Sequence, residues 1–213
     1  MMAQRHAFNL SPPLLLSGLL LLLTACGEDP ERVMTRVRYL QNKEQYDEAI
    51  TTALKGADHV PNKDRAELLL KAVELAHTQN ALTGKKTYAT QSLEILKTLM
   101  DEKLLMDGQP EAMAAKIFDS HGKFEKASKY LMAAEKIAAT QNMDLAGNYR
   151  IDLVQLFNRP GSKDQAIKEA KVFLNKYPRH PRREEMENTL YQLEAELESQ
   201  WQAQYASPEQ SSE

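Results

Sequence analysis

The chain has 213 residues, with 27 Lys and Arg against 30 Asp and Glu and a formal net charge of −3 at pH 7. A nucleic-acid-binding domain usually carries a basic excess, so this balance argues against a nucleic-acid partner. Glycine is scarce, at 8 residues, whereas leucine, alanine, glutamate and lysine are abundant. This composition favours helices over sheets.

The N-terminal segment has the features of a secretory signal peptide. Arg5 is its only charged residue, and an apolar run from Leu14 to Leu23 follows, interrupted only by Ser17 and Gly18. At a rise of about 1.5 Å per residue, a helix over this run is too short for a hydrocarbon core of about 30 Å. We therefore expect residues 1–25 to be a cleaved leader.

The single cysteine of the chain follows this run directly. The stretch Leu23-Thr24-Ala25-Cys26 resembles the lipobox of bacterial lipoproteins. The resemblance implies cleavage before Cys26, lipidation of its sulfur, and further acylation with a fatty acid such as palmitate. Gly27 stands where an aspartate retains enterobacterial lipoproteins in the inner membrane. The resemblance therefore implies an outer-membrane anchor facing the periplasm, with the inner membrane as the less favoured location.

Two other interpretations of this segment remain open. The chain is either an ordinary secreted protein with a free thiol, or it keeps the apolar run as an uncleaved signal anchor. In every case residues 30–205 suit one helical domain with a sizeable core, preceded by a short linker over residues 26–29. The polar tail, residues 206–213, is expected to be disordered.

Hydrophobic periodicity and helix-start signals predict nine helices in the domain. They are expected at residues 30–42, 45–59, 64–80, 86–105, 110–121, 124–140, 144–158, 163–176 and 181–204. The start signals are Asp29 with Pro30 at the first helical position, and the capping-box pairs Asp64–Glu67 and Ser162–Gln165.

Four segments of the domain align around one alanine each, namely Ala49, Ala89, Ala127 and Ala166. Successive alanines are therefore 40, 38 and 39 positions apart. A fixed period of this size in a helical sequence indicates a stacked array of helical hairpins. A small residue at this position lets the two helices of a hairpin cross closely.

The aligned segments resemble the tetratricopeptide repeat (TPR). The matching residues are Tyr46, Ala49, Ala53, Gly56 and Pro61 in the first copy, Gly122, Phe124, Ala127, Leu131 and Ala134 in the third, and Gly161, Ala166, Ala170, Phe173 and Pro178 in the fourth. The second copy keeps Ala89 and little else. The resemblance implies an all-α, TPR-like superhelical array of about four hairpins, in which the aromatic residue three before the alanine fills the gap beside the helix crossing.

The ninth predicted helix carries one apolar stripe with polar flanks. Met186, Leu190, Leu193 and Leu197 follow one another at spacings of four, three and four residues, as on one face of a helix. Such a helix is typical of the cap that closes a repeat array. A helix that mediates oligomerisation is the alternative interpretation.

The sequence lacks the motifs of common catalytic sites. It has no glycine-rich phosphate loop, no H-E-x-x-H, no G-x-S-x-G and no Cys–His pair. His59, His77, His121 and His180 each lie apart, near a predicted helix end or turn. We therefore expect no enzyme, no cofactor and no metal site.

In TPR proteins the first helix of each hairpin lines a groove. When the copies are aligned on their alanines, the resemblance implies that the following residues line the groove: Met34, Arg38, Gln41, Lys116, Asp119, Ile151, Gln155 and Asn158. In the divergent second copy, Lys71 and Glu74 are further candidates. This mixed polar set suits an extended peptide or a partner helix. For each residue the alternative is a plain solvated face.

A second candidate surface is a run of cations between the last two helices. Lys168, Lys171, Lys176, Arg179, Arg182 and Arg183 crowd this basic turn, and Glu184 and Glu185 follow it. The turn suits an acidic protein, anionic lipid heads or cell-wall polymers. The alternative is a solvated turn without a partner.

These observations lead to one functional expectation and two rivals. The expectation is an envelope scaffold or assembly factor, similar in plan to the TPR lipoprotein of outer-membrane barrel assembly and to type IV pilus pilotins. A helical ligand-binding lipoprotein that serves a transporter would need a closed apolar pocket instead. An accessory subunit of an envelope enzyme or cell-wall complex would depend on the basic turn. The partner and the oligomeric state are not fixed by the sequence.

Overall fold

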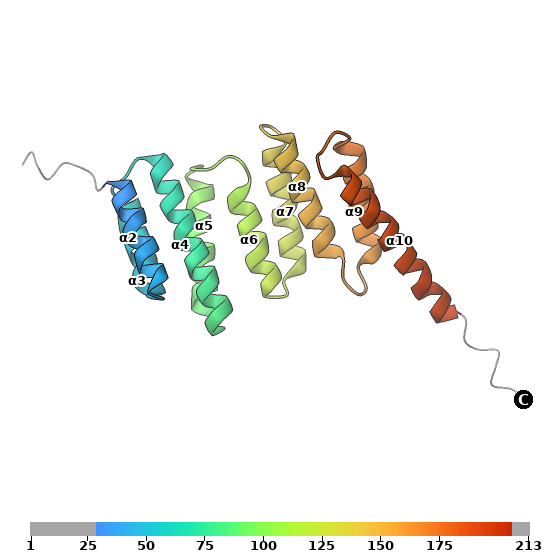
Figure 1. Ribbon diagram of the computed structural model, residues 1–213, viewed down its shortest axis with the longest axis horizontal. Helices are drawn as coiled ribbons and strands as arrows, with labels where there is room; N and C mark the ends of the chain where they lie inside the picture. Colours follow the sequence, from blue (N-terminus) through green and yellow to red (C-terminus); the bar gives the residue numbers. More distant parts are fainter. Residues whose placement is uncertain (1–28, 206–213) are drawn as a thin grey trace, which may run out of the picture.

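A computed structural model describes residues 29–205 (Figure 1). The leader, the lipobox with Cys26 and the tail over residues 206–213 lie outside the described residues. The helices are α2 (Pro30–Asn42), α3 (Tyr46–Ala57), α4 (Asn62–Thr83), α5 (Lys86–Asp101), α6 (Gln109–Ser120), α7 (Phe124–Ala138), α8 (Met143–Phe157), α9 (Lys163–Lys176) and α10 (Arg183–Tyr205).

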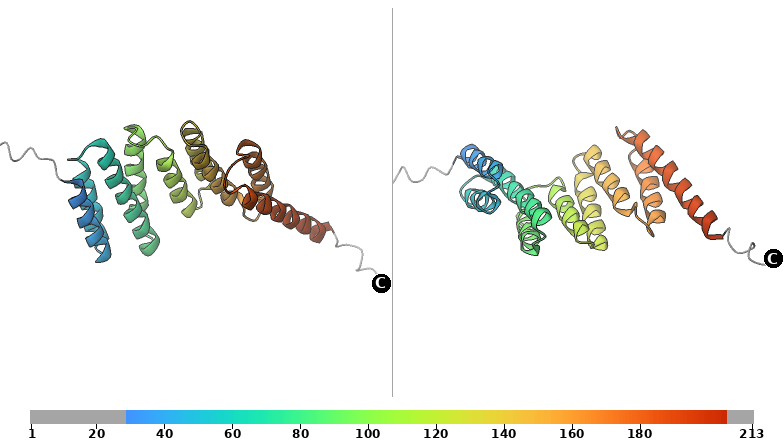
Figure 2. Two further views of the ribbon diagram at one scale, coloured as in Figure 1. Left: turned by 45° about the horizontal axis from the view of Figure 1, so that its top comes forward. Right: turned by 60° about the horizontal axis from the view of Figure 1, so that its bottom comes forward.

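Consecutive helices pack side by side and form an elongated array of four hairpins that ends in α10 (Figures 1 and 2). Helices α2, α4, α6 and α8 lie on the near face in Figure 1, and α3, α5, α7 and α9 lie behind them. The predicted all-α architecture is therefore confirmed. None of the helices in the described part of the chain is long and apolar enough to cross a membrane.

The first helix begins as predicted, but two other start signals act differently. The Asp29 side chain accepts a hydrogen bond from the backbone N–H of Glu31, and Pro30 occupies the first turn of α2. Helix α4 begins at Asn62, directly after Pro61, so the prediction that Asp64 caps this helix was wrong. Ser162 does precede α9, but its side chain makes no capping hydrogen bond.

The aligned alanines lie at the crossings inside the hairpins. Ala49, Ala127 and Ala166 have no exposed surface, and Ala89 is also buried. Of the aromatic residues three positions earlier, Tyr46 packs against the core as predicted. The prediction for the third copy was wrong, because the Phe124 side chain is 44% exposed.

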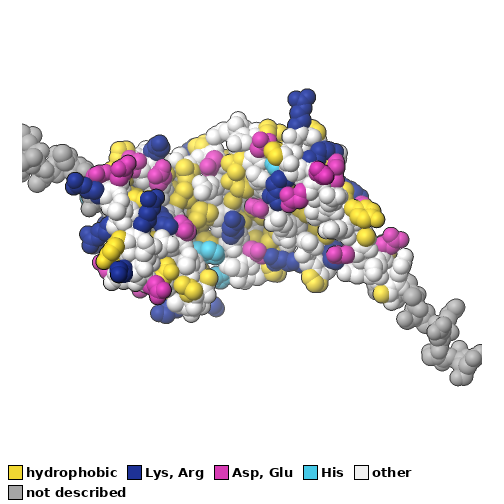
Figure 3. Space-filling model, in the orientation of Figure 1, with side chains coloured by type: hydrophobic (Ala, Val, Ile, Leu, Met, Phe, Trp, Pro, Cys, Tyr) yellow, Lys and Arg dark blue, Asp and Glu magenta, His cyan; other side chains and the backbone are white. Residues whose placement is uncertain are grey.

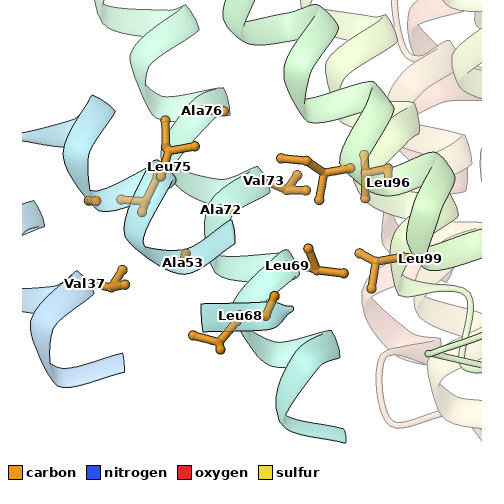
Figure 4. Packing of buried hydrophobic residues seen from close by; sticks show 14 of the residues in the cluster. Val37, Ala53, Leu68, Leu69, Ala72, Val73, Leu75, Ala76, Leu96 and Leu99 are labelled. Carbon is orange, nitrogen blue, oxygen red and sulfur yellow. The ribbon is translucent and has the colours of Figure 1, made fainter. Parts of the chain in front are cut away.

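The hydrophobic core consists of two clusters that meet at α6. In the first cluster, Leu69 and Val73 of α4 point toward Leu96 and Leu99 of α5 (Figure 4). The second cluster runs from α6 to α10, where the predicted stripe of the last helix packs on α9. Each hairpin is thus held by its neighbours, as the repeat period predicts.

Helix α6 belongs to both clusters. Ala114 and Ile117 pack in the first cluster, whereas Ala112 and Ala115 pack in the second. These four residues alternate around the helix, so α6 buries two opposite sides. A smaller part of its surface is therefore left for polar side chains than in a helix that covers a single core.

Candidate functional site

A groove follows the face formed by α2, α4, α6 and α8. Its first part lies between α2 and α4, and its middle part also reaches α6. Met34, Arg38 and Glu67 line both parts, so the two are continuous. Lys116 of α6 lines the middle part and also the last part, between α6 and α8. Figure 3 shows this face, with hydrophobic and charged side chains interspersed along it.

The last part of the groove is a pocket of about 220 Å³ between α6, α7 and α8. Leu131 and Leu156 form its apolar lining, and Asp119, Asp152 and Gln155 are among its polar residues. Burial raises the pKa of the Asp152 carboxyl, although the positive charges of Lys116 and Arg182 lower it in part. The pocket therefore holds a partly desolvated carboxylate beside an apolar surface.

Most of the residues predicted to line the groove are brought together by the structure. Met34, Arg38, Lys71, Glu74, Lys116, Asp119 and Gln155 all line it. Gln41 on α2 and Asn158, which caps the C-terminal end of α8, lie outside the groove lining. The prediction for Ile151 was wrong, because its side chain is 1% exposed and packs in the second core cluster. Asp152, the next residue, lines the groove instead.

The charges along the groove fall into paired and unpaired groups. Lys71 Nζ lies 2.9 Å from the Glu74 carboxylate, and Arg159 forms an ion pair with Asp119. The Arg159 guanidinium also lies 4.1 Å from the centre of the Phe124 ring, which it covers by a cation–π contact. Arg38 and Lys116 make no ion pair with any residue in the described range.

The basic turn is largely neutralised by acidic neighbours. Lys171 pairs with Glu194 at 2.7 Å, Lys176 with Glu135 at 2.8 Å, Arg182 with Glu185 at 2.6 Å and Arg183 with Glu187 at 2.8 Å. Lys168 and Arg179 are exposed and make no ion pair with any described residue. The turn is therefore in large part an ion-paired connection between α9 and α10.

The structure also contains a buried ionic network that the sequence analysis missed. The Arg150 guanidinium of α8 bridges the carboxylates of Glu135 on α7 and Glu169 on α9. Both glutamates are less than 5% exposed. The Glu135 carboxylate also accepts hydrogen bonds from Lys176 and from the Tyr177 hydroxyl. A signal for this network existed, since Glu135 and Glu169 lie on the same faces of their helices as buried alanines.

Over residues 29–205, no group of three or more His, Cys, Asp or Glu side chains is placed to hold a metal ion. His77 lies near His121 and Lys116, and burial together with these two charges lowers the pKa of the His77 imidazole.

Comparison with known proteins supports the fold. The chain is similar to a kinesin light chain protein of Podosopora anserina with nearly identical TPR-like repeats, at 17% identity and a TM-score of 0.55, over 83% of this chain and 92% of that one. It is also similar to the MamA protein, at 16% identity and a TM-score of 0.48, over 84% of this chain and 97% of that one. No family model and no curated protein matches the sequence. The fold is that of a TPR-like helical repeat array.

Proposed function

We propose that this chain is a membrane-anchored periplasmic lipoprotein that holds another envelope protein, as a scaffold or assembly factor. The observation that carries the proposal is the continuous groove across α2, α4, α6 and α8. The groove crosses all four helices of this face, so it suits an extended segment of a partner that runs across them.

The lining of the groove indicates the chemistry of the partner segment. Met34, Leu70 and Met113 give its middle part an apolar surface, and methionine adapts to side chains of different shapes. Arg38 and Lys116 flank this surface as unpaired cations. An extended segment with apolar side chains between acidic ones would contact the apolar surface and also pair with the two cations. The small pocket at the end of the groove would take one more apolar side chain.

The proposed anchor is close to the groove. Cys26 precedes Asp29 by three residues, and three residues reach at most about 10 Å. A lipid on Cys26 would therefore hold the start of α2 near the membrane surface, and stable attachment requires at least two acyl chains. The proposal places a partner segment in the groove within a short distance of the bilayer.

The two rival functions find less support. A transporter's ligand-binding lipoprotein needs a pocket that encloses a small molecule, typically of about 300–1,000 Å³. The pocket between α6 and α8 is smaller, at about 220 Å³, and opens onto the groove. The larger hollows, of about 460 and 520 Å³, are continuous stretches of the groove, and most of their lining residues are charged. An accessory subunit that acts through the basic turn would need free cations there, and most of them are paired within the chain.

The proposal is tested by crosslinking and pull-down from intact membranes. The native chain is expected to carry the mass of an acylated Cys26 at its N-terminus and to capture one dominant envelope protein. In the groove variant, Arg38→Glu with Lys116→Glu, we expect the anchor to remain and the capture to be lost. The variant Cys26→Ala is expected to lose the acyl mass.

The matched control reverses two exposed lysines on the opposite helices α5 and α7, Lys97→Glu with Lys129→Glu. It makes the same change in net charge and should keep the partner. An N-terminal peptide without acyl chains would contradict the anchor. Equal capture by the groove variant and the control would contradict the groove as the binding site.

A further inference from the structure

The helices at the two ends of the array, α2 and α10, carry opposite charge. Residues 29–43, which include α2, contain four cationic and two acidic side chains. Residues 183–205, which form α10, contain one cationic and six acidic side chains. The array is elongated, and α2 and α10 lie at its two ends (Figure 1). Helix α3, beside α2, adds Asp47 and Glu48 against Lys55. The positive charge of this end is therefore confined to α2, whereas α10 is acidic along its length.

The outer face of α2 carries an exposed tyrosine among cations. Val33, Val37 and Leu40 are buried against the array, so the opposite side of the helix faces outward. Tyr39 is 60% exposed on that side, and Lys43 Nζ lies 5.9 Å from the centre of its ring. Arg32, seven residues before Tyr39, lies on the same side.

These cations remain accessible to a partner. The Arg32 side chain is 88% exposed and its guanidinium lies 3.5 Å from the Asp29 carboxylate. The Arg36 side chain is 66% exposed and lies 4.0 Å from the carboxylate of Glu48. Exposed ion pairs of this kind contribute little and exchange readily for others. We call the surface of Arg32, Arg36, Tyr39 and Lys43 the head surface.

The outer face of α10 carries the complementary pattern. Tyr191 is 75% exposed, and Glu184 and Glu198 lie seven residues before and after it, on the same side of the helix. Neither glutamate forms an ion pair with a residue that the structure describes. Tyr191 thus stands between two exposed carboxylates on the outer face of the helix that closes the array. We call Glu184, Tyr191 and Glu198 the tail surface.

We propose that the tail surface of one copy binds the head surface of a second copy, so that the arrays associate head to tail. In this contact the two tyrosines meet, and the glutamates on either side of Tyr191 face the cations on either side of Tyr39. The seven-residue spacing places both glutamates about 10 Å from Tyr191 along α10 and Arg32 about 10 Å from Tyr39 along α2. Lys43, four residues after Tyr39, lies about 6 Å from it along the helix axis. Because the two surfaces differ, the contact is heterologous and extends into open chains of copies. It leaves the groove free.

Sedimentation tests the proposal on the chain from residue 26 onward with Cys26→Ser. The weight-average mass is expected to rise with protein concentration at about 50 mM NaCl and to fall toward the monomer at about 500 mM, because salt screens exposed charges. The head variant is Arg32→Ala, Arg36→Ala and Tyr39→Ser. The tail variant is Glu184→Gln, Tyr191→Ser and Glu198→Gln. Each alone should remain a monomer.

The decisive measurement is an equimolar mixture of the two variants. Each variant keeps one intact surface, so the mixture should form a 1:1 dimer and nothing larger. A control with Lys97→Ala and Lys129→Ala should associate like the parent chain, and circular dichroism melts verify that all variants fold. A monomeric parent chain at every concentration overturns the proposal. Self-association of the head variant alone also overturns it, since that result indicates an α10–α10 contact.

Discussion

Tyr177 donates its hydroxyl hydrogen to the carboxylate of Glu135, which lies 42 positions earlier in the chain. The two residues belong to different hairpins, since Glu135 is on α7 and Tyr177 follows α9. Arg150, on the helix between them, binds the same carboxylate. The third and fourth hairpins are therefore joined by polar contacts as well as by apolar packing, and these contacts are directional.

We expect that removing Arg150, the central cation of this network, lowers the free energy of unfolding substantially. Arg150→Ala leaves the carboxylates of Glu135 and Glu169 buried with fewer compensating partners. Breaking a buried ion pair in this way typically costs about 3–5 kcal/mol. We expect a loss of unfolding free energy of about this size in urea denaturation. Lys176→Ala removes a cation whose side chain is 44% exposed, and should cost much less. An equal loss in both variants would contradict the central role of Arg150.

The same network gives the stability of the array a defined pH dependence. Burial raises the pKa of the Glu135 carboxyl, but hydrogen bonds from Lys176, Tyr177 and Arg150 outweigh it and hold the pKa below the usual 4.5. The contribution of Glu135 is therefore complete above that usual value and is lost as the pH falls through the lower folded pKa. Thermal melts should show stability dropping steeply in this range. Glu135→Gln should be less stable at neutral pH and show a shallower drop.

Gly147 on α8 leaves room for the His180 ring. A Cβ atom at position 147 would lie 2.4 Å from His180 Cδ2, and His180 Nε2 is within hydrogen-bond distance of the Asp144 carbonyl oxygen, at 2.9 Å. We expect Gly147→Ala to destabilise the array by about 1–3 kcal/mol through overpacking, despite the better helix propensity of alanine. In a His180→Ala background the same change should be neutral or stabilising. Without that reversal, the steric explanation fails.

We expect the Asp152 carboxylate to destabilise the fold and to contribute to binding of the partner. Since burial raises its pKa above the usual 3.8, the ionised carboxylate destabilises the fold at neutral pH. Asp152→Asn should raise Tm by about 1–4 °C at pH 7, and the gain should shrink as the pH falls through the raised pKa. The same variant should capture the partner less well, whereas Asp101→Asn, an exposed control, should change neither property. A variant that gains stability and binds normally would remove Asp152 from the binding site.

Much of the array follows from local signals in the sequence. Pro30, Pro61 and Pro178 each lie at or near a helix boundary, and the buried alanines set the hairpin crossings. The start of α4 was predicted two residues late, because the capping-box spacing of Asp64 and Glu67 imitates a start inside a helix that Pro61 has already begun. Local patterns of this kind place a boundary to within a turn.

The candidate site was harder to predict, because it depends on how helices rotate against one another. Ile151 is buried, whereas Asp152, the next residue, lines the groove. A rotation of α8 about its axis by one residue would exchange their positions, and the sequence does not specify this rotation. Arg150, Glu135 and Glu169 resemble ordinary surface charges until three helices bring them together. Phe124 departs from the repeat pattern: it is exposed, and its ring contacts Arg159, 35 positions later.

The double burial of α6 restricts how this chain can change length. In many repeat proteins a hairpin can be deleted or inserted wherever two units meet, because every junction is alike. Here a chain that ended after α6 would leave Ala112 and Ala115 uncovered, and a chain that began at α6 would do the same to Ala114 and Ile117. A shorter array that begins or ends at α6 therefore exposes apolar surface at that end.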